Sequence, residues 1–270
     1  MKNRFELAKE VFIDSIDLDD YIELGASQAV YRQLESSIEK PLKMVLVFGK
    51  PGTGKSILLN RIANKLRNKK EIYYFDTPAT TQQEFFHKIF KILTDKDLPN
   101  NAEVNFSSLI EFCKGFRGQR EIVIILDEAQ MYEAELMEKI RLLSDTRVVK
   151  FIVSLHKTEN EDLIAKEHFQ SRIWEVIELK NATVEELSTY IHKKLLKKNL
   201  YEISNYIKDR EMKLIHKFTD GNFRESNKLM FTIFEICEYY DMNEPNRLNS
   251  SKISKKIIEM AAIKLGYIDA

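Results

Sequence analysis

The stretch Gly49-Lys50-Pro51-Gly52-Thr53-Gly54-Lys55-Ser56 decides the fold that the sequence predicts, because it fits the pattern GxxxxGK[ST]. Glycines let successive backbone N–H groups approach phosphate oxygens closely and form an anion-binding concavity. Lys55 supplies a positive charge for the β- and γ-phosphates, and the Ser56 hydroxyl is a ligand for Mg²⁺. An apolar strand precedes the loop, and the helix that follows directs its positive N-terminus at the same place. The stretch therefore predicts a phosphate-binding loop.

Glycine is scarce in the rest of the chain. The 270 residues include eight glycines and five prolines, and three of the eight glycines (Gly49, Gly52 and Gly54) lie in this one loop. Such scarcity favours long helices with short connections. The clustering marks a place where the backbone itself has a task.

A second motif follows a buried strand further along the chain. The apolar run Ile122-Val123-Ile124-Ile125-Leu126 ends in Asp127 and Glu128. Asp127 at the strand tip is placed to hold Mg²⁺ through water or through Ser56, and Glu128 to orient and deprotonate an attacking water. Two adjacent acids are also typical of a helix N-terminus. The phosphate loop upstream favours the catalytic interpretation.

Short apolar runs alternate with longer stretches of helical periodicity between residues 42 and 179. This alternation predicts an α/β fold, with a mainly parallel five-stranded sheet covered by helices on both faces. Helices are expected to begin at Lys55, near Thr81, near Gln130 and behind the fourth strand. The expected strands are Leu42–Phe48, Glu71–Asp76, Glu121–Leu126, Val148–Leu155 and Trp174–Leu179.

Only helical patterns follow Leu179. Thr183-Val184-Glu185-Glu186 has the form of a capping box. Further helices are expected over Asp209–Phe218, Asn222–Tyr240 and Ser251–Leu265. We therefore expect three parts, namely an N-terminal helical segment over residues 1–40 with an N-cap at Ser27, an α/β core over 41–180 and a small all-helical domain over 181–270.

Two arginines have a functional and a local interpretation. Arg224 falls in the first turn of a helix capped by Asn222, where a cation opposes the macrodipole. Contact with nucleotide phosphates would explain it, and so would a local pair with Asp220 or Glu225. Arg172 directly precedes the last strand. In a ring or dimer it can reach the γ-phosphate of a neighbour, and an exposed, idle arginine is the alternative.

Weaker candidates complete the set. Ser154 and His156 end the fourth strand, and the sequence does not choose between them as a sensor of the γ-phosphate. Thr77, after the second strand, could restrain Glu128 through a hydrogen bond or simply form a turn. The run from His192 to Lys198 could touch DNA phosphates. A solvated helix face is the more ordinary interpretation of such a run.

The composition excludes several classes of protein. A hydrophobic share of 44% with 31% charged residues is that of a soluble globular protein, and the formal net charge is zero, which gives no support to a dedicated nucleic-acid binder. Apolar runs stay far below the length of about 20 residues that a membrane span needs, and no secretory signal is visible. The two cysteines, Cys113 and Cys237, are far apart and predict buried thiols. A cytoplasmic location is expected.

Taken together, these motifs resemble those of the AAA+ ATPases. The resemblance rests on residues 49–56, on Asp127-Glu128-Ala129-Gln130, on Arg172 before the fifth strand and on Gly221-Asn222-Phe223-Arg224, which looks like a sensor-2 motif. It covers about residues 20–240. Within that superfamily the DEAQ sequence and the helix entered through Ser27-Gln28 look most like the general-secretion-pathway A-type ATPases, whose relatives include transposition helpers and origin-recognition-type initiators.

The resemblance implies a sheet in the order 5-1-4-3-2, a helical lid, and ATP with Mg²⁺ held between core and lid. It also implies assembly into a dimer, ring or filament. The implied catalytic residues are Lys55, Glu128, His156, Arg172 and Arg224, and the implied metal ligands are Ser56 and Asp127. The residues expected to bind the nucleotide are Gly49, Pro51, Gly52, Thr53, Gly54, Lys55, Ser56, Ile57 and Arg224.

Three outputs are compatible with such an ATPase. The first is assembly or remodelling of a partner complex, such as a secretion, pilus or DNA-uptake apparatus. The second is a DNA-bound ATPase of the transposition-helper or initiator type. The third is a nucleotide-gated interaction module with little hydrolysis. A role at the inner face of the membrane is expected only through a partner. In a separate departure from the resemblance, Thr77-Pro78 stands where relatives tend to carry Asn-Pro.

Overall fold

The computed structural model describes residues 3–13, 18, 21–99, 101–156, 172–248 and 252–269. The chain divides into two compact units. The first, called here the helical unit, comprises Met1–Gln28, Pro51–Gly54 and Lys180–Ala270. The second, called here the α/β unit, comprises Ala29–Lys50 and Lys55–Leu179.

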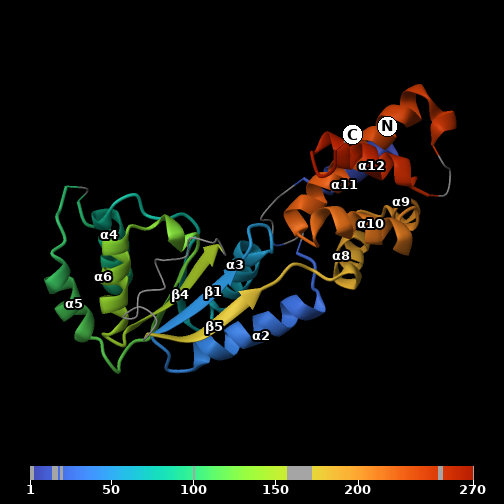
Figure 1. Ribbon diagram of the computed structural model, residues 1–270. Coiled ribbons are helices and arrows are strands. Elements are labelled where there is room, and N and C mark those ends of the chain that lie inside the picture. Colours follow the sequence, from blue (N-terminus) through green and yellow to red (C-terminus); the bar gives the residue numbers. More distant parts are fainter. Residues whose placement is uncertain are drawn as a thin grey trace. The chain divides into compact units, whose positions relative to one another are not determined.

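A five-stranded sheet forms the centre of the α/β unit. Its strands pair in the order β2-β3-β4-β1-β5, and every pair is parallel (Figure 1). This confirms the expected order 5-1-4-3-2. The strands are β1 (Met44–Gly49), β2 (Glu71–Phe75), β3 (Ile122–Leu126), β4 (Val149–His156) and β5 (Ile173–Leu179).

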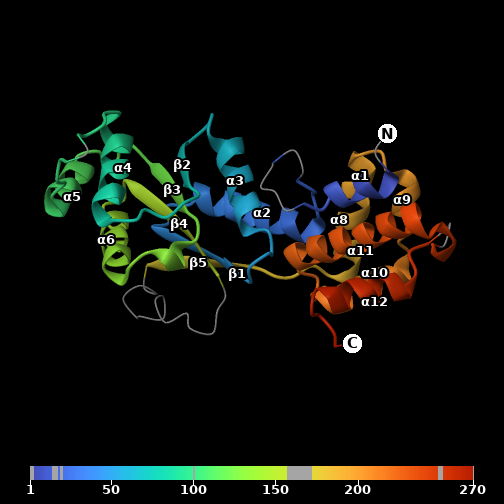
Figure 2. The ribbon, with the colours of Figure 1, turned by 90° about the horizontal axis from the view of Figure 1, so that it is seen from above.

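Helices cover both faces of this sheet (Figures 1 and 2). One face packs against α2 (Gly25–Glu39) and α3 (Lys55–Leu66). The other packs against α4 (Gln82–Thr94), α5 (Phe106–Lys114) and α6 (Ala134–Ser144). Because side chains alternate along a strand, each strand supplies both cores. This is why β3 is apolar throughout and fully buried.

The helical unit is built around one long helix, α11 (Phe223–Asn243). The rings of Phe5 and Phe12 pack on Phe234 of this helix, with centroids 6.4 and 5.8 Å away. The N-terminal helix therefore contributes to the core of the helical unit. The other helices of this unit are α1 (Arg4–Glu10), α8 (Val184–Lys197), α9 (Tyr201–Asn205), α10 (Asp209–Thr219) and α12 (Lys255–Lys264), with the 3₁₀ turn η3 (Pro245–Arg247).

The capping box that begins α8 is confirmed. The Thr183 side chain accepts from the Glu186 N–H, and the Glu186 carboxylate accepts from the Thr183 N–H. The N-cap expected at Ser27 is wrong, because α2 already begins at Gly25. The same Glu186 carboxylate accepts from the N–H of Ala26, so a first-turn donor of α2 is satisfied by a residue far along the chain.

Other boundaries differ by local backbone geometry. Glu128 has a left-handed backbone, so the chain behind β3 forms the 3₁₀ turn η2 (Ala129–Met131) first, and α6 begins only at Ala134. The short helices α5 and α9 were not expected. The helix expected behind the fourth strand falls in residues 157–171, outside the described residues. None of the helices in the described ranges is long and apolar enough to cross a membrane.

Candidate active site

The lysine of the phosphate loop is buried within the α/β unit. Lys55 begins α3 directly behind the loop and is 4% exposed. Its Nζ donates to the carbonyl of Gly49 at 2.8 Å and to that of Lys50 at 3.1 Å. Gly49 is the last residue of β1, so the ammonium lies at the carboxyl end of the sheet. Open α/β sheets bind their ligands at this end.

The tip of the loop belongs to the helical unit and contacts the start of α11. Asn222 donates to the Pro51 carbonyl at 2.6 Å while it caps α11, and the Phe223 N–H donates to the Gly52 carbonyl at 3.2 Å. Gly52 has φ +80°, and a Cβ there would lie 2.3 Å from Asn222 Oδ1 and 2.7 Å from Arg224 Cβ. Only glycine fits this position. Arg224 itself is exposed in the first turn of α11.

Asp127 is a buried carboxylate at the tip of β3. It is 2% exposed and, by strand alternation, lies on the face that α3 covers. The Tyr74 hydroxyl donates to Asp127 Oδ2 at 2.8 Å and lies 3.4 Å from the Ser56 carbonyl oxygen. Burial and the neighbouring Asp127 carboxylate raise the pKa of Tyr74, which keeps this hydroxyl a donor. Tyr74 therefore links the tip of β3 to the start of α3.

The residues around Asp127 fit a divalent cation. Within the described ranges the carboxylate receives only neutral donors, the Tyr74 hydroxyl and the Glu128 N–H at 3.0 Å. A buried carboxylate is costly unless a positive charge compensates it. No described group of three or more His, Cys, Asp or Glu side chains could hold a metal by itself. The single buried carboxylate of Asp127 suits Mg²⁺, which is usually held by one or two carboxylates together with substrate phosphates.

Glu128 is held by two neighbours. His156 Nε2 lies 2.9 Å from Glu128 Oε1, and the Gln130 amide donates to the other carboxylate oxygen. Gln130 also lies 3.3 Å from His156 Nδ1, and its oxygen accepts from the His156 backbone N–H. An imidazole that carries its proton at Nε2 makes both contacts, because Nε2–H donates to Glu128 and Nδ1 accepts from the Gln130 amide.

Ser154 lies on the same face of β4 as His156, two positions earlier. It pairs in register with Val47 of β1 and is fully buried. Its hydroxyl has no hydrogen-bond partner among the residues that the structure describes. A buried, unsatisfied hydroxyl costs about 1–3 kcal/mol, so a ligand or water at this edge would stabilise it. Both candidates on the fourth strand thus face the side of the sheet that carries α3.

Within the α/β unit, Arg172 lies at the end of the sheet opposite to Gly49. Its Nε is 3.6 Å from Asp145 Oδ1, and the following residue, Ile173, pairs with Met44 at the amino end of β1. Gly49 is at the opposite end of that strand. The neighbouring residues Gln170 and Ser171 lie outside the described ranges. In this chain Arg172 is therefore not part of the cluster around Lys55 and Asp127.

Two weaker candidates have other surroundings. Thr77 is exposed. Thr77 and Glu128 both lie in the described ranges, and no hydrogen bond joins them. In the basic run on α8, Lys193 and Lys197 donate to the carbonyls of Glu23 and Tyr21, and Lys194 is buried. These contacts lie within the helical unit and are those of a packed helix.

Sequence reasoning missed Tyr74 and Gln130. Tyr74 is one of two adjacent tyrosines on β2, and only strand alternation together with the position of Asp127 picks it out. Gln130 ends the motif Asp127-Glu128-Ala129-Gln130, yet its contact with both Glu128 and His156 depends on the left-handed turn at Glu128.

Most of the α/β unit matches a known protein family in sequence. Residues 38–164 match the model of the family described as the AAA domain. The five-stranded parallel sheet with its helices has the AAA+ P-loop fold. No curated protein matches the chain in sequence.

Solved structures with this AAA+ fold cover most of the chain. The Aeropyrum pernix Orc1 protein in complex with DNA aligns with a TM-score of 0.63 and 14% identity, over 95% of this chain and 69% of that one. Cdc6p from Pyrobaculum aerophilum gives 0.68 and 13%, over 94% and 70%. The Thermotoga maritima RuvB Holliday junction branch migration motor gives 0.56 and 20%, over 94% and 73%. At such identities the likeness concerns the fold.

Proposed function

We propose that the chain binds Mg-ATP and hydrolyses it. The observation that carries this proposal is the buried Asp127 carboxylate, which has only neutral donors in the described ranges and is linked through Tyr74 to the start of α3. Such a carboxylate is suited to a cation that also binds phosphate oxygens. Lys55, buried behind the phosphate loop, supplies the second positive charge.

Each residue has a defined task in this proposal. Glu128 takes the proton of the attacking water, and His156 orients its carboxylate. Ser56 and Asp127 hold Mg²⁺, which when bound offsets charge on the phosphate oxygens. The backbone of Gly49–Ser56 and the first residue behind it, Ile57, surround the phosphates. Arg224 couples the nucleotide to the helical unit, and Arg172 acts on the site of a neighbouring subunit.

Replacement of the metal ligand tests the proposal. The variant Asp127→Asn keeps the size of the side chain, removes its charge and leaves one acceptor oxygen in place of two. We expect Mg²⁺-dependent ATP turnover to fall by at least about 100-fold. Asp76→Asn makes the same charge change at the exposed end of β2 and should leave turnover within about twofold. Equal turnover in the wild-type protein and Asp127→Asn would contradict the proposal.

We further propose that hydrolysis drives assembly or remodelling of a partner complex, as in a secretion, pilus or DNA-uptake apparatus. The sequence Asp127-Glu128-Ala129-Gln130 supports this through its likeness to general-secretion-pathway A-type ATPases. The expected domain limits, with a core over 41–180 and a lid over 181–270, belong to this proposal. So do a homo-oligomeric state and a cytoplasmic location with recruitment to the membrane by a partner.

A groove on the helical unit favours a second candidate, a DNA-bound ATPase. A cavity of about 240 Å³ lies between α10 and α12. Arg210, Lys213 and Lys217 share one face of α10 by their spacing, and Lys255 of α12 adds a fourth cation to the lining. The other lining residues are Glu211, Leu214 and Ile258. The counterion release that drives DNA binding requires such clustered cations. Aligned structures include an Orc1 protein in complex with DNA.

The two candidates differ in their response to DNA. The second expects duplex or single-stranded DNA to raise ATP turnover, with a stimulation that falls steeply with salt. The double variant Lys213→Ala/Lys217→Ala should lose this stimulation, whereas Lys228→Ala on exposed α11 surface should keep it. Turnover that is indifferent to DNA would favour the first candidate. Negligible turnover with ATP binding retained would favour a nucleotide-gated interaction module.

A further inference from the structure

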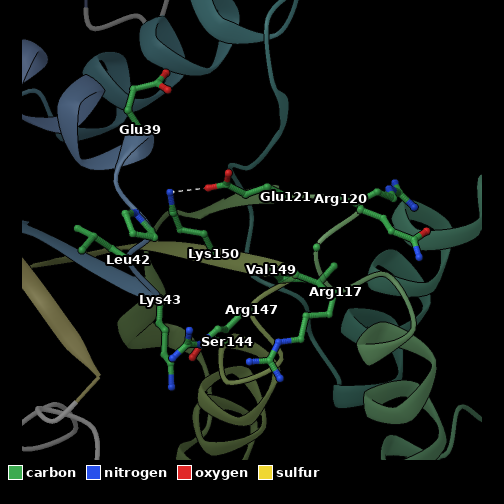
Figure 3. A pocket seen from close by; sticks show the side chains of 14 residues that line it. Glu39, Leu42, Lys43, Arg117, Arg120, Glu121, Ser144, Arg147, Val149 and Lys150 are labelled. Atoms are coloured by element: carbon green, nitrogen blue, oxygen red, sulfur yellow. Dashed lines mark hydrogen bonds and ion pairs between the residues drawn. The ribbon is translucent and has the colours of Figure 1, made fainter.

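A cavity of about 520 Å³ lies in the α/β unit at the amino ends of β1, β3 and β4 (Figure 3). It is lined by three connections, Glu39–Lys43 before β1, Arg117–Glu121 before β3 and Ser144–Lys150 before and into β4. These are the amino ends of their strands, whereas Gly49 and Asp127 lie at the carboxyl ends. The cavity is therefore separate from the candidate active site.

The lining of this cavity is rich in positive charge. Five of its side chains are basic and two are acidic. Both acids are already paired, Glu39 with Lys70 at 2.9 Å and Glu121 with Lys150 at 2.8 Å. The basic residues are Lys43, Arg117, Arg120, Arg147 and Lys150.

Three of the five cations have structural partners. Lys150 is 3% exposed and also donates to the carbonyls of Ile38 and Lys40. Arg120 pairs with Glu71, and Lys43 with Asp145. Arg117 and Arg147 differ, because both are exposed and neither guanidinium makes a hydrogen bond or ion pair with another described residue. Figure 3 shows Lys43, Arg117 and Arg147 extending toward the same side of the cavity. This is the arrangement expected around an anion.

The backbone of Arg147 supplies an independent argument. Its φ is +61°, a region in which a side chain crowds the backbone. Of the five described non-glycine residues with positive φ, three are Asp or Asn, which tolerate it, and the other two are Glu128 and Arg147. Glu128 belongs to the candidate active site. Strained backbone of this kind concentrates at functional positions, where it directs a particular side chain.

The strained turn is firmly held. The Arg147 N–H donates to the Ser144 carbonyl at 3.2 Å. The Thr146 hydroxyl donates to the Leu143 carbonyl at 2.7 Å and accepts from the Val148 N–H at 3.3 Å. These bonds fix the direction in which the Arg147 side chain points. None of them involves the guanidinium group. The side chain therefore remains available to a ligand.

We propose that this cavity binds a small phosphate-bearing anion of more than one charge, with Arg117 and Arg147 as its principal ligands. Guanidinium groups present paired donors that match phosphate oxygens, and two of them on one side of a cavity favour an anion with several such oxygens. The volume lies in the range of pockets for small molecules, about 300–1,000 Å³. A recessed cavity favours such a molecule over a nucleic-acid backbone, which needs an open basic stripe.

Binding of inorganic tripolyphosphate to the full chain tests the proposal. All proteins carry Lys55→Ala, which weakens the phosphate loop, and binding is measured by calorimetry at physiological salt. We expect saturable binding that Arg117→Ala and Arg147→Ala each weaken at least tenfold. Arg32→Ala, which removes an exposed arginine of α2 outside the cavity, should change the affinity less than twofold. Binding that survives the first two variants, or falls equally in all three, would overturn the proposal.

A second variant separates binding from folding. Arg147→Gly removes the guanidinium and relieves the positive φ, so we expect a melting temperature at or above that of the parent together with lost binding. A variant that binds tripolyphosphate as the parent does would contradict the role of Arg147. Citrate that binds as tightly as tripolyphosphate would overturn the choice of phosphate. An oligonucleotide that binds tighter through the same arginines would overturn the small ligand.

Discussion

At the scale of single residues, Glu128 is the position where turnover and binding should separate. The variant Glu128→Gln keeps a polar side chain that His156 and Gln130 can contact and removes the base. We expect ATP binding within about threefold of the wild-type protein and turnover lowered by at least about 100-fold, the usual contribution of a general base. Nucleotide titration and phosphate release measure the two quantities. Unchanged turnover would remove Glu128 from the mechanism.

Tyr74 should set the requirement for magnesium. The variant Tyr74→Phe removes the hydroxyl that donates to Asp127 and leaves the ring in place. We expect the Mg²⁺ concentration for half-maximal turnover to rise several-fold, because outer contacts of this kind orient a metal ligand. Tyr73→Phe is the matched control, since Tyr73 points to the other face of the sheet and contacts Glu71. Equal Mg²⁺ dependence in both variants would contradict this role.

At the scale of elements, the first turn of α4 carries a charge that should show in the pH dependence of stability. Hydrogen bonds from Lys88 and from Thr80 lower the pKa of Glu84 from its ordinary value of 4.5 to about 2. A carboxyl with a lowered pKa stabilises the folded state above its ordinary pKa, and this contribution is lost as the pH falls toward 2.

The variant Glu84→Gln should therefore unfold more easily than the wild-type protein at neutral pH. We expect a loss below about 1 kcal/mol, because the Glu84 side chain is 39% exposed. The difference should shrink between about pH 5 and about pH 3. Thermal unfolding of both proteins across this range measures it, with Glu111→Gln on α5 as a control for loss of a paired surface charge. A difference that is constant with pH would contradict the assignment.

Elements differed in how well the sequence predicted them. The five strands were predicted within two residues at each end. The reason is clearest for β1 and β3, which are buried apolar runs between polar residues. The capping box of α8 was predicted because all its hydrogen bonds are local. The start of α2 was not, because its N-terminal donor is satisfied by Glu186.

At the scale of the whole molecule, the proposed role of Arg172 requires a second copy of the chain. If Arg172 completes the site of a neighbour, turnover per subunit should rise with protein concentration, and Arg172→Ala should give a low, concentration-independent rate, with a loss of about 10³-fold or more at saturation. Arg141→Ala is the control, because Arg141 also pairs with Asp145. A rate per subunit that is independent of concentration in the wild-type protein would contradict the shared site.

The sequence by itself determined the class of fold, the strand order through family resemblance, and the positions of Lys55, Asp127 and Glu128. These follow from local patterns, since a loop that cradles phosphate needs glycines at fixed spacing and a buried strand needs an apolar run. Only the tertiary structure decided the partners of those residues. Tyr74 contacts Asp127 because parallel strands place β2 beside β3. His156 contacts Glu128 because the left-handed turn behind β3 directs that carboxylate toward the end of β4. Contacts between residues far apart in sequence depend on register and backbone geometry, which no local pattern records.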